Sequence, residues 1–270
     1  MRKNKLRELI SKGKPTLGTH VMSTWTGVIE LVGYTGLFDY IEFLSTYTPW
    51  DLHDLDNVAK ATELASISSM IKVDQEPRTF IAERALAAGI QNFLFADIRT
   101  VEDAEQAVKA VRAEPKGVMG MGMFRSVEYV FAKSSPSDFR RACDDAVIAF
   151  MIEKKSAIEH LEEILSVDGF DMIQFGPWDY SLSIGLSGEP GTPWGLNHPK
   201  VKEAELKAIK TALKMGKRPR VELDTLENAD EYINMGVKDF CIGTDVSILF
   251  EWWKNKGENM RKLLSKLEHT

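Results

Sequence analysis

Residues 148–179 contain two short apolar runs that each end at a carboxylate, Ile148-Ala-Phe-Met-Ile-Glu153 and Met172-Ile-Gln-Phe-Gly-Pro-Trp-Asp179. Short continuous apolar runs are typical of strands that are buried on both faces of a parallel sheet. The segment between the two runs has a helical pattern. This strand–helix–strand order is the unit from which parallel α/β folds are built.

The same unit recurs outward from this stretch in both directions. We expect eight strands, at Thr16–Val21, Asp39–Leu44, Ser69–Val73, Asn92–Ala96, Ile148–Glu153, Met172–Gly176, Arg218–Leu223 and Asp239–Gly243. Eight strand–helix units in roughly 250 residues predict a (β/α)₈ TIM barrel formed by residues 1–270 as a single domain. The alternative is an open doubly wound sheet, but the sequence has neither GxGxxG nor GxxxxGK[ST].

Two helix boundaries support this interpretation. Thr100 and Asp103 have the spacing of a capping box. Asn197 followed by His and Pro199 is typical of an N-cap with proline in the first turn, and Gly216 is placed to end that helix.

Composition excludes several classes of protein. The 270 residues include 34 Lys and Arg against 40 Asp and Glu, a net charge of −6. This acidic balance disfavours nucleic-acid binding and anionic membranes. Cys143 and Cys241 are too far apart for a CxxC zinc motif. There is no secretory signal or membrane span in the sequence, so we expect a cytoplasmic protein.

Polar residues near the carboxyl ends of barrel strands are the natural candidates for chemistry. Glu153 and Asp179 follow adjacent strands, whereas Lys72 and Glu42 lie within earlier ones. Two carboxylates at neighbouring strand ends are suited to a hard divalent ion. On pattern alone, helix capping or pairing with lysine explains them equally well.

The sequence around these carboxylates resembles the HpcH/HpaI aldolase family. Its metal motif is matched by Met151-Ile-Glu153, Gly176-Pro-Trp-Asp-Tyr-Ser181 and Ser183-Ile-Gly185, and the spacing 179 − 153 = 26 also fits. The resemblance covers nearly the whole chain, with further matches at Leu17-Gly-Thr19, Glu30-Leu-Val-Gly-Tyr-Thr-Gly36 and Gly243-Thr-Asp245.

The resemblance implies a metal-dependent carbon–carbon lyase, an aldolase that acts on a 2-oxo acid and an aldehyde through a pyruvate-type enolate. It implies Mg, Mn or Co bound by Glu153 and Asp179, a terminal helix exchanged between subunits, and a hexamer or trimer of dimers. The substrate-binding residues that it implies are Gly120, Gly122, Arg125, Gly176, Pro177, Trp178 and Ser181.

The chain departs from the family pattern where the usual catalytic histidine should be. The family's D-x-E-H at the end of the second strand aligns with Leu44, Thr46 and Tyr47. Lys72 aligns with a substrate-binding arginine and offers a point charge in place of a bidentate fork. Met119 replaces the arginine of the family's R-G-x-G loop.

Three residues are candidates for the missing acid/base. Tyr47 occupies the position of the histidine, and its phenol normally titrates near 10. His20 ends the first strand and has an imidazole suited to neutral pH. Glu42 lies in an apolar strand where burial can raise a carboxyl pKa. A structural ion pair with Lys72 explains Glu42 as well, and a packing role explains His20.

Other functions remain open on the sequence alone. The same enolate serves a decarboxylase or a condensing enzyme. The altered base region is also compatible with a non-catalytic 2-oxo-acid-binding protein. The loop from Gly185 to Gly195, with Trp194, follows the sixth strand on the active-site face of a barrel, and we expect it to contribute to the pocket.

Overall fold

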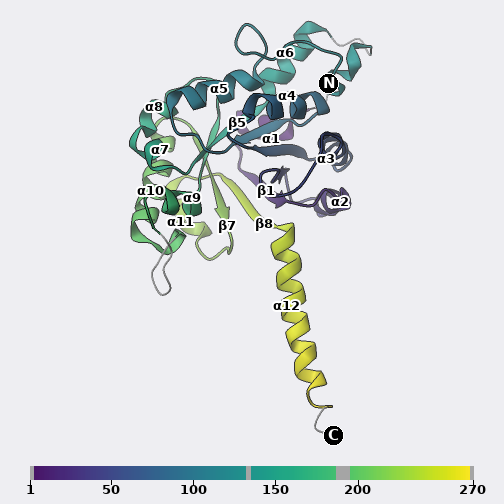
Figure 1. The fold of residues 1–270 in the computed structure, drawn as a ribbon, viewed down its shortest axis with the longest axis vertical. Coiled ribbons are helices and arrows are strands. Elements are labelled where there is room, and N and C mark those ends of the chain that lie inside the picture. The colour runs from purple at the N-terminus through teal and green to yellow at the C-terminus, as the bar shows by residue number, and fades with distance from the viewer. Residues whose placement is uncertain (1–2, 132–134, 187–194, 268–270) are drawn as a thin grey trace.

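Eight parallel strands pair in chain order, and the first closes onto the last to form a barrel. The computed structural model describes residues 3–131, 135–186 and 195–267 (Figure 1). The strands are β1 (Thr16–Val21), β2 (Tyr40–Phe43), β3 (Ser68–Val73), β4 (Asn92–Phe95), β5 (Val147–Ile152), β6 (Met172–Phe175), β7 (Arg218–Leu223) and β8 (Asp239–Thr244). Every expected strand is present with ends within one residue of the prediction, so the (β/α)₈ barrel is confirmed.

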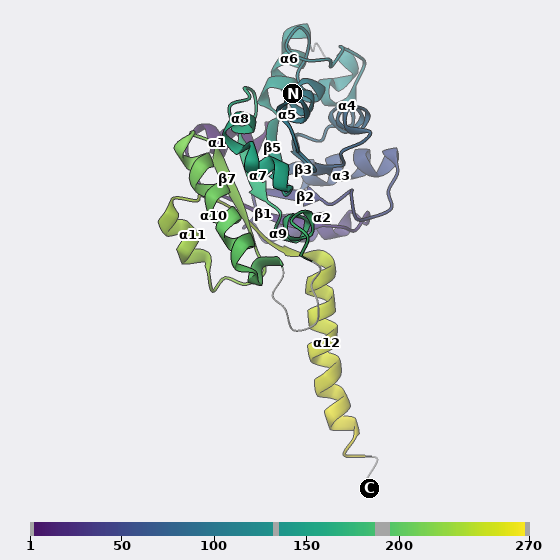
Figure 2. The same cartoon turned by 60° about the vertical axis from the view of Figure 1, so that its left-hand side comes forward.

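Helices connect the strands or flank the sheet in sequence, and most of them surround the barrel on the outside (Figures 1 and 2). They are α1 (Lys5–Ser11), α2 (Gly27–Tyr34), α3 (Leu52–Leu64), α4 (Arg78–Ala88), α5 (Val101–Val111), α6 (Pro136–Asp145), α7 (Lys155–Glu159), α8 (Leu161–Leu165), α9 (Pro177–Ser183), α10 (Pro199–Lys214), α11 (Ala229–Met235) and α12 (Asp245–Leu264), with short 3-10 turns η1 (Arg125–Val130) and η2 (Gly195–Asn197). The layer between strands and helices holds most of the buried apolar side chains.

The two expected helix starts differ in outcome. Helix α5 begins with the predicted capping box, in which the Thr100 hydroxyl accepts from the Asp103 amide at 3.1 Å. Helix α10 starts one residue later than expected. Its N-cap is His198, whose Nδ1 accepts from the Lys200 amide, and Pro199 takes the first helical position. Proline is tolerated there because that position needs no amide hydrogen bond.

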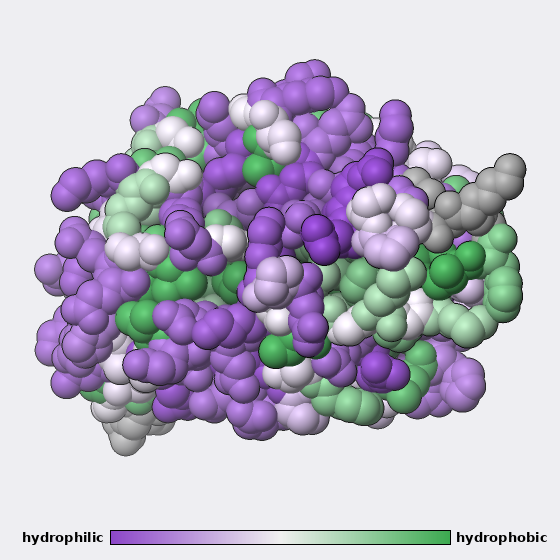
Figure 3. All heavy atoms as spheres, turned by 90° about the horizontal axis from the view of Figure 1, so that it is seen from above, coloured by the Kyte–Doolittle hydropathy of each residue, from purple (hydrophilic) through white to green (hydrophobic). Residues whose placement is uncertain are grey.

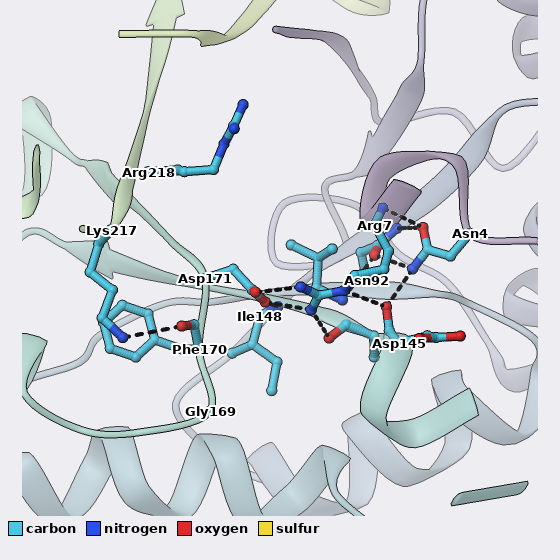
Figure 4. Close-up of polar contacts among 12 residues, drawn as sticks. Asn4, Arg7, Asn92, Asp145, Ile148, Gly169, Phe170, Asp171, Lys217 and Arg218 are labelled. Carbon is cyan, nitrogen blue, oxygen red and sulfur yellow. Dashed lines mark hydrogen bonds and ion pairs between the residues drawn. The ribbon is translucent and has the colours of Figure 1, made fainter. Parts of the chain in front are cut away.

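Helix α1 closes the amino end of the barrel. Leu6 is fully buried in a cluster of interior residues from β2 to β6. The Arg7 guanidinium binds both oxygens of Asp171 at 2.6 and 2.8 Å, and Asn4 donates to Asn92 and to the Asp145 carbonyl (Figure 4). With this end filled, the carboxyl end is the side on which a cavity can form.

Helix α12 projects away from the barrel (Figures 1 and 2). Its large apolar side chains, among them Phe250, Trp252 and Trp253, are exposed. The opposite side of the molecule is mostly hydrophilic, with small scattered apolar patches (Figure 3). In the described part of the chain, no helix is long and apolar enough to cross a membrane.

Candidate active site

A cavity of about 310 Å³ opens at the carboxyl end of the barrel. Most of the expected site residues line it, although they come from five different strands or the loops that follow them. These are His20, Glu42, Tyr47, Lys72, Glu153, Gly176, Pro177, Trp178 and Asp179. The barrel therefore brings together in one cavity residues that are up to 159 positions apart (179 − 20 = 159).

Glu153 lies directly after β5 and is almost fully buried. Its Oε1 accepts a hydrogen bond from the Asp97 amide at 2.8 Å. Burial, with a further contribution from the negative charge of Asp179, raises the pKa of Glu153, and Lys72 opposes the shift. A cation beside this carboxylate would relieve the cost of keeping it ionised.

Asp179 lies in the first turn of α9, and its carboxylate lines the same cavity. Its Oδ1 accepts from Lys154 Nζ at 2.9 Å, and the same ammonium contacts Asp97 at 2.8 Å. Lys154 thus forms ion pairs with both Asp97 and Asp179.

Glu153 and Asp179 fit a divalent metal ion. Both donors are carboxylates, the oxygen ligands that Mg²⁺ and Mn²⁺ prefer. Among the described residues, no group of three His, Cys, Asp or Glu side chains is placed to share one ion. The chain would therefore supply two ligands and leave the other coordination positions to substrate and water.

Tyr47 and Lys72 form a pair on the β2–β3 side of the cavity. Lys72 Nζ donates to the Tyr47 hydroxyl at 2.6 Å. Burial lowers the pKa of Lys72, but Tyr47 and the carboxylates of Glu153 and Glu42 outweigh it, so the pKa is raised. Lys72 is therefore a permanent cation, and the Tyr47 proton is left free to point elsewhere.

A buried ion pair of Glu42 with Arg220 forms the floor of the cavity. Burial raises the pKa of Glu42, but Arg220 and His20 outweigh it and lower the pKa to about 2. The ion pair with Lys72 considered above is therefore replaced by one with Arg220. A carboxylate with so low a pKa is a poor general base, which argues against the catalytic role considered for Glu42.

His20 lies between Arg220 and Glu222. Its Nε2 is 3.1 Å from the Arg220 Nη2, and its Nδ1 is 3.5 Å from Glu222 Oε1. Its Nε2 is also 3.6 Å from Glu42 Oε2. Burial lowers the pKa of His20, but Cys241 and Glu42 outweigh it and raise the pKa well above its ordinary value. His20 is therefore held by neighbours on both ring nitrogens.

Four expected substrate contacts lie outside this cavity. Arg125 is bound to Glu63 and Asp56 on helix α3, and its sequence position did not reveal these partners. Gly120 and Gly122 lie in the segment after α5 and do not line the cavity. The Ser181 hydroxyl donates to the Trp178 carbonyl within α9, as a local helix contact. That these residues contact substrate stays a prediction.

The expected contribution of Trp194 lies outside the described residues. Just beyond it, Leu196 does line the cavity.

Sequence reasoning missed six polar residues around the cavity, among them Glu205 on α10 and Asp224 just after β7. Arg220 and Glu222 lie on β7, Gln174 lies on β6, and Lys154 follows Glu153. The signal was present in Arg218-Pro-Arg-Val-Glu-Leu223, because charged residues inside a strand of a parallel barrel need a partner or a function.

A parallel barrel with carboxylates and a buried lysine at its carboxyl end defines a (β/α)₈ enzyme. The model of the HpcH/HpaI aldolase/citrate lyase family matches residues 51–249, and the chain belongs to this family of enzymes.

Individual proteins agree with this assignment. The 4-hydroxy-2-oxo-heptane-1,7-dioate aldolase of Shigella sonnei is 25% identical over 251 residues, covering 91% of this chain and 90% of that protein. Two crystal structures share the fold. Citrate synthase SbnG has a TM-score of 0.85 and 18% identity, with 97% of this chain and 100% of that chain covered. An HpcH/HpaI aldolase/citrate lyase family protein from Burkholderia cenocepacia has a TM-score of 0.84 and 22% identity, covering 96% and 100%.

Proposed function

We propose that this enzyme is a divalent-metal-dependent aldolase that cleaves or forms a carbon–carbon bond of a 2-oxo acid through a pyruvate-type enolate. The observation that carries the proposal is the shared cavity of Glu153, Asp179, Lys72 and Tyr47. Enzymes of this family depend on divalent metals, and Glu153 and Asp179 are the side chains suited to holding one here. When bound, the ion supplies positive charge that stabilises the enolate oxygen.

Lys72 is placed to bind the carboxylate of the 2-oxo acid. It lines the cavity, and its raised pKa keeps it charged. Unlike the arginine usual in the family, it offers a point charge with no bidentate geometry. Part of its hydrogen-bonding capacity goes to Tyr47.

Tyr47 is placed to deliver a proton to the enolate carbon. Because the Lys72 ammonium donates to the phenol oxygen, the phenol O–H is free to point into the cavity. The side chain that aligns with the family's aspartate is Leu44, an apolar residue of the cavity wall. The pair of Lys72 and Tyr47 therefore takes the place of a histidine held by a carboxylate.

This arrangement also favours a second activity, decarboxylation of a 2-oxo diacid. Loss of carbon dioxide yields the same enolate and needs a proton donor but no base for a hydroxyl. Tyr47 held by Lys72 meets that requirement. Condensation of the enolate with an acceptor is the reverse of the cleavage reaction and would use the same residues.

The proposal is tested by Mn²⁺ binding, measured by calorimetry, and by exchange of the pyruvate methyl protons in D₂O, measured by NMR. Glu153→Gln and Asp179→Asn should weaken Mn²⁺ binding and abolish exchange. Tyr47→Phe should bind Mn²⁺ as the unmodified enzyme does, but exchange about 10²-fold more slowly or worse. Glu159→Gln, which changes an exposed carboxylate on nearby α7, is the matched control.

Two outcomes would overturn the proposal. One is full exchange by metal-free Glu153→Gln. The other is an unmodified, Mn²⁺-loaded enzyme that neither exchanges pyruvate protons nor cleaves or decarboxylates any 2-oxo acid.

A further inference from the structure

The β6–β7 wall of the cavity offers more hydrogen-bond acceptors than donors. Glu222, near the end of β7, has a side chain that is 43% exposed, and Asp224 follows it. Gln174 on β6 is 2% exposed and lines the same wall. These three side chains present carboxylate and amide oxygens to the cavity.

The orientation of the Gln174 amide is fixed by Glu222. Gln174 Nε2 donates to Glu222 Oε2 at 3.1 Å, and the reverse orientation would set an oxygen against a carboxylate. The Gln174 Oε1 is then buried with no hydrogen-bond partner among the described residues. A buried acceptor without a hydrogen bond costs free energy, and a donor group on a bound ligand would remove that cost.

Three other carboxylates of the cavity are each balanced by a cation, and Glu153 is the proposed metal ligand. Glu42 is paired with Arg220, Glu205 with Lys202, and Asp179 with Lys154.

Within the described ranges, no lysine or arginine lies at ion-pair distance from Glu222 or Asp224. The nearest cationic group of Glu222 is His20, at 3.5 Å, and Glu42 contacts the same ring at 3.6 Å. One imidazole thus faces two carboxylates, and Asp224 adds a further negative charge to this wall.

The cavity is therefore polarised. Lys72 supplies positive charge on the β3 side, where the 2-oxo acid carboxylate is expected, and Glu222 and Asp224 supply negative charge on the β7 side. A second carboxylate on the substrate would face like charge there, and such juxtaposition is unfavourable.

We propose that the part of the substrate beyond the reacting bond carries hydrogen-bond donors, hydroxyl or ammonium groups, and no carboxylate. Gln174, Glu222 and Asp224 are the residues that read it. This inference rests on the proposed aldolase function, for which it names the class of the aldehyde partner.

The assay is the condensation of pyruvate with an aldehyde by the Mn²⁺-loaded enzyme. C3 of pyruvate loses one proton and forms a bond to the aldehyde carbon, and the aldehyde oxygen gains one proton to become a hydroxyl. The product, a 4-hydroxy-2-oxo acid, contains all atoms of both reactants. No oxidant or other reactant is needed.

Three aldehydes separate the possibilities: 3-hydroxypropanal, 3-aminopropanal and succinic semialdehyde. We expect kcat/KM for the hydroxyl and ammonium aldehydes to exceed that for the carboxylate aldehyde by about tenfold or more. Equal or greater activity with succinic semialdehyde would overturn the inference. This series uses the unmodified enzyme and does not depend on any variant folding.

Variants then test the named residues. The quantity compared is the ratio of kcat/KM for 3-aminopropanal to kcat/KM for succinic semialdehyde. Glu222→Gln and Asp224→Asn should each reduce this ratio, and the double variant should reduce it most. Glu227→Gln removes an exposed carboxylate of the same loop that does not line the cavity, and should leave the ratio unchanged. An unchanged ratio in the double variant would refute the role of these residues.

Proton exchange of pyruvate without any aldehyde shows whether a negative result contradicts the inferred aldehyde class or the proposed aldolase function. If the unmodified enzyme exchanges these protons but prefers the carboxylate aldehyde, only the inference about the partner is wrong. If it shows no exchange and no other 2-oxo acid activity, the proposed function fails and this inference fails with it.

Discussion

At the scale of single residues, charge placed inside the barrel governs both stability and chemistry. Arg220 and Glu42 are almost completely removed from water and pair with each other. Removing one member of a buried pair leaves the other charged without compensation, which costs more than the pair itself contributes. These two residues should therefore behave as a unit.

We predict that Glu42→Gln lowers the free energy of unfolding by about 3–5 kcal/mol at pH 7. The measurement is urea unfolding followed by circular dichroism. Glu42→Gln combined with Arg220→Met should recover much of the loss, because no unpaired charge remains. Glu227→Gln, which changes an exposed carboxylate, is the control. A loss in the double variant as large as in Glu42→Gln would contradict the argument.

The stability loss in Glu42→Gln should depend on pH, and the direction follows from the lowered pKa of Glu42. The pKa of Glu42 is lowered to about 2 in the folded protein, below its ordinary value. Its contribution is therefore complete above the ordinary carboxyl pKa and is lost as the pH falls toward 2. The stability difference between Glu42→Gln and the unmodified protein should shrink across that interval.

At the scale of elements, α1 shows how a short helix can complete a barrel. It has only seven residues, too few to be stable alone in water. It is held by burial of Leu6 and by the contacts of Arg7 with Asp171 and the carbonyls of Asp145 and Ala146. The starts of β5 and β6 are thereby tied to one side chain, that of Arg7 (Figure 4).

We predict that Arg7→Ala lowers the free energy of unfolding by about 2 kcal/mol, because charged hydrogen bonds are lost and Asp171 loses its cation. Urea unfolding measures the effect. Arg141→Ala is the matched control, since Arg141 forms an exposed ion pair with Asp138, and such pairs contribute under about 1 kcal/mol. Equal effects of the two variants would contradict a special role for Arg7.

At the scale of the whole molecule, α12 projects away from the closed barrel and leaves its apolar side chains without cover in the single chain. Its exposed apolar side chains form a surface that monomeric proteins rarely present to water. The resemblance to the family supplies an occupant for it, a second subunit that exchanges this helix. We propose that α12 packs on a neighbouring subunit in a homo-oligomer.

We predict that the unmodified protein is oligomeric, and that Trp252→Ala with Trp253→Ala shifts it toward monomer. Burial of large aromatic side chains dominates many interfaces, so their removal should weaken association most. Sedimentation velocity at several protein concentrations measures the shift. Lys254→Ala with Lys256→Ala, on the same helix, should change it little. A monomeric unmodified protein would refute this proposal.

The sequence by itself determined the order and extent of the strands, because apolar periodicity is a local property of the chain. It also located Glu153 and Asp179, since residues after parallel strands reach the same end of the barrel. It did not determine partners. Glu42 joins Arg220, Lys72 joins Tyr47, and Arg125 turns to Glu63, because closure of the barrel brings together residues as far apart as 178 positions (220 − 42 = 178). Only the tertiary structure fixes such pairings, because each depends on which side chains the fold places within contact distance of one another.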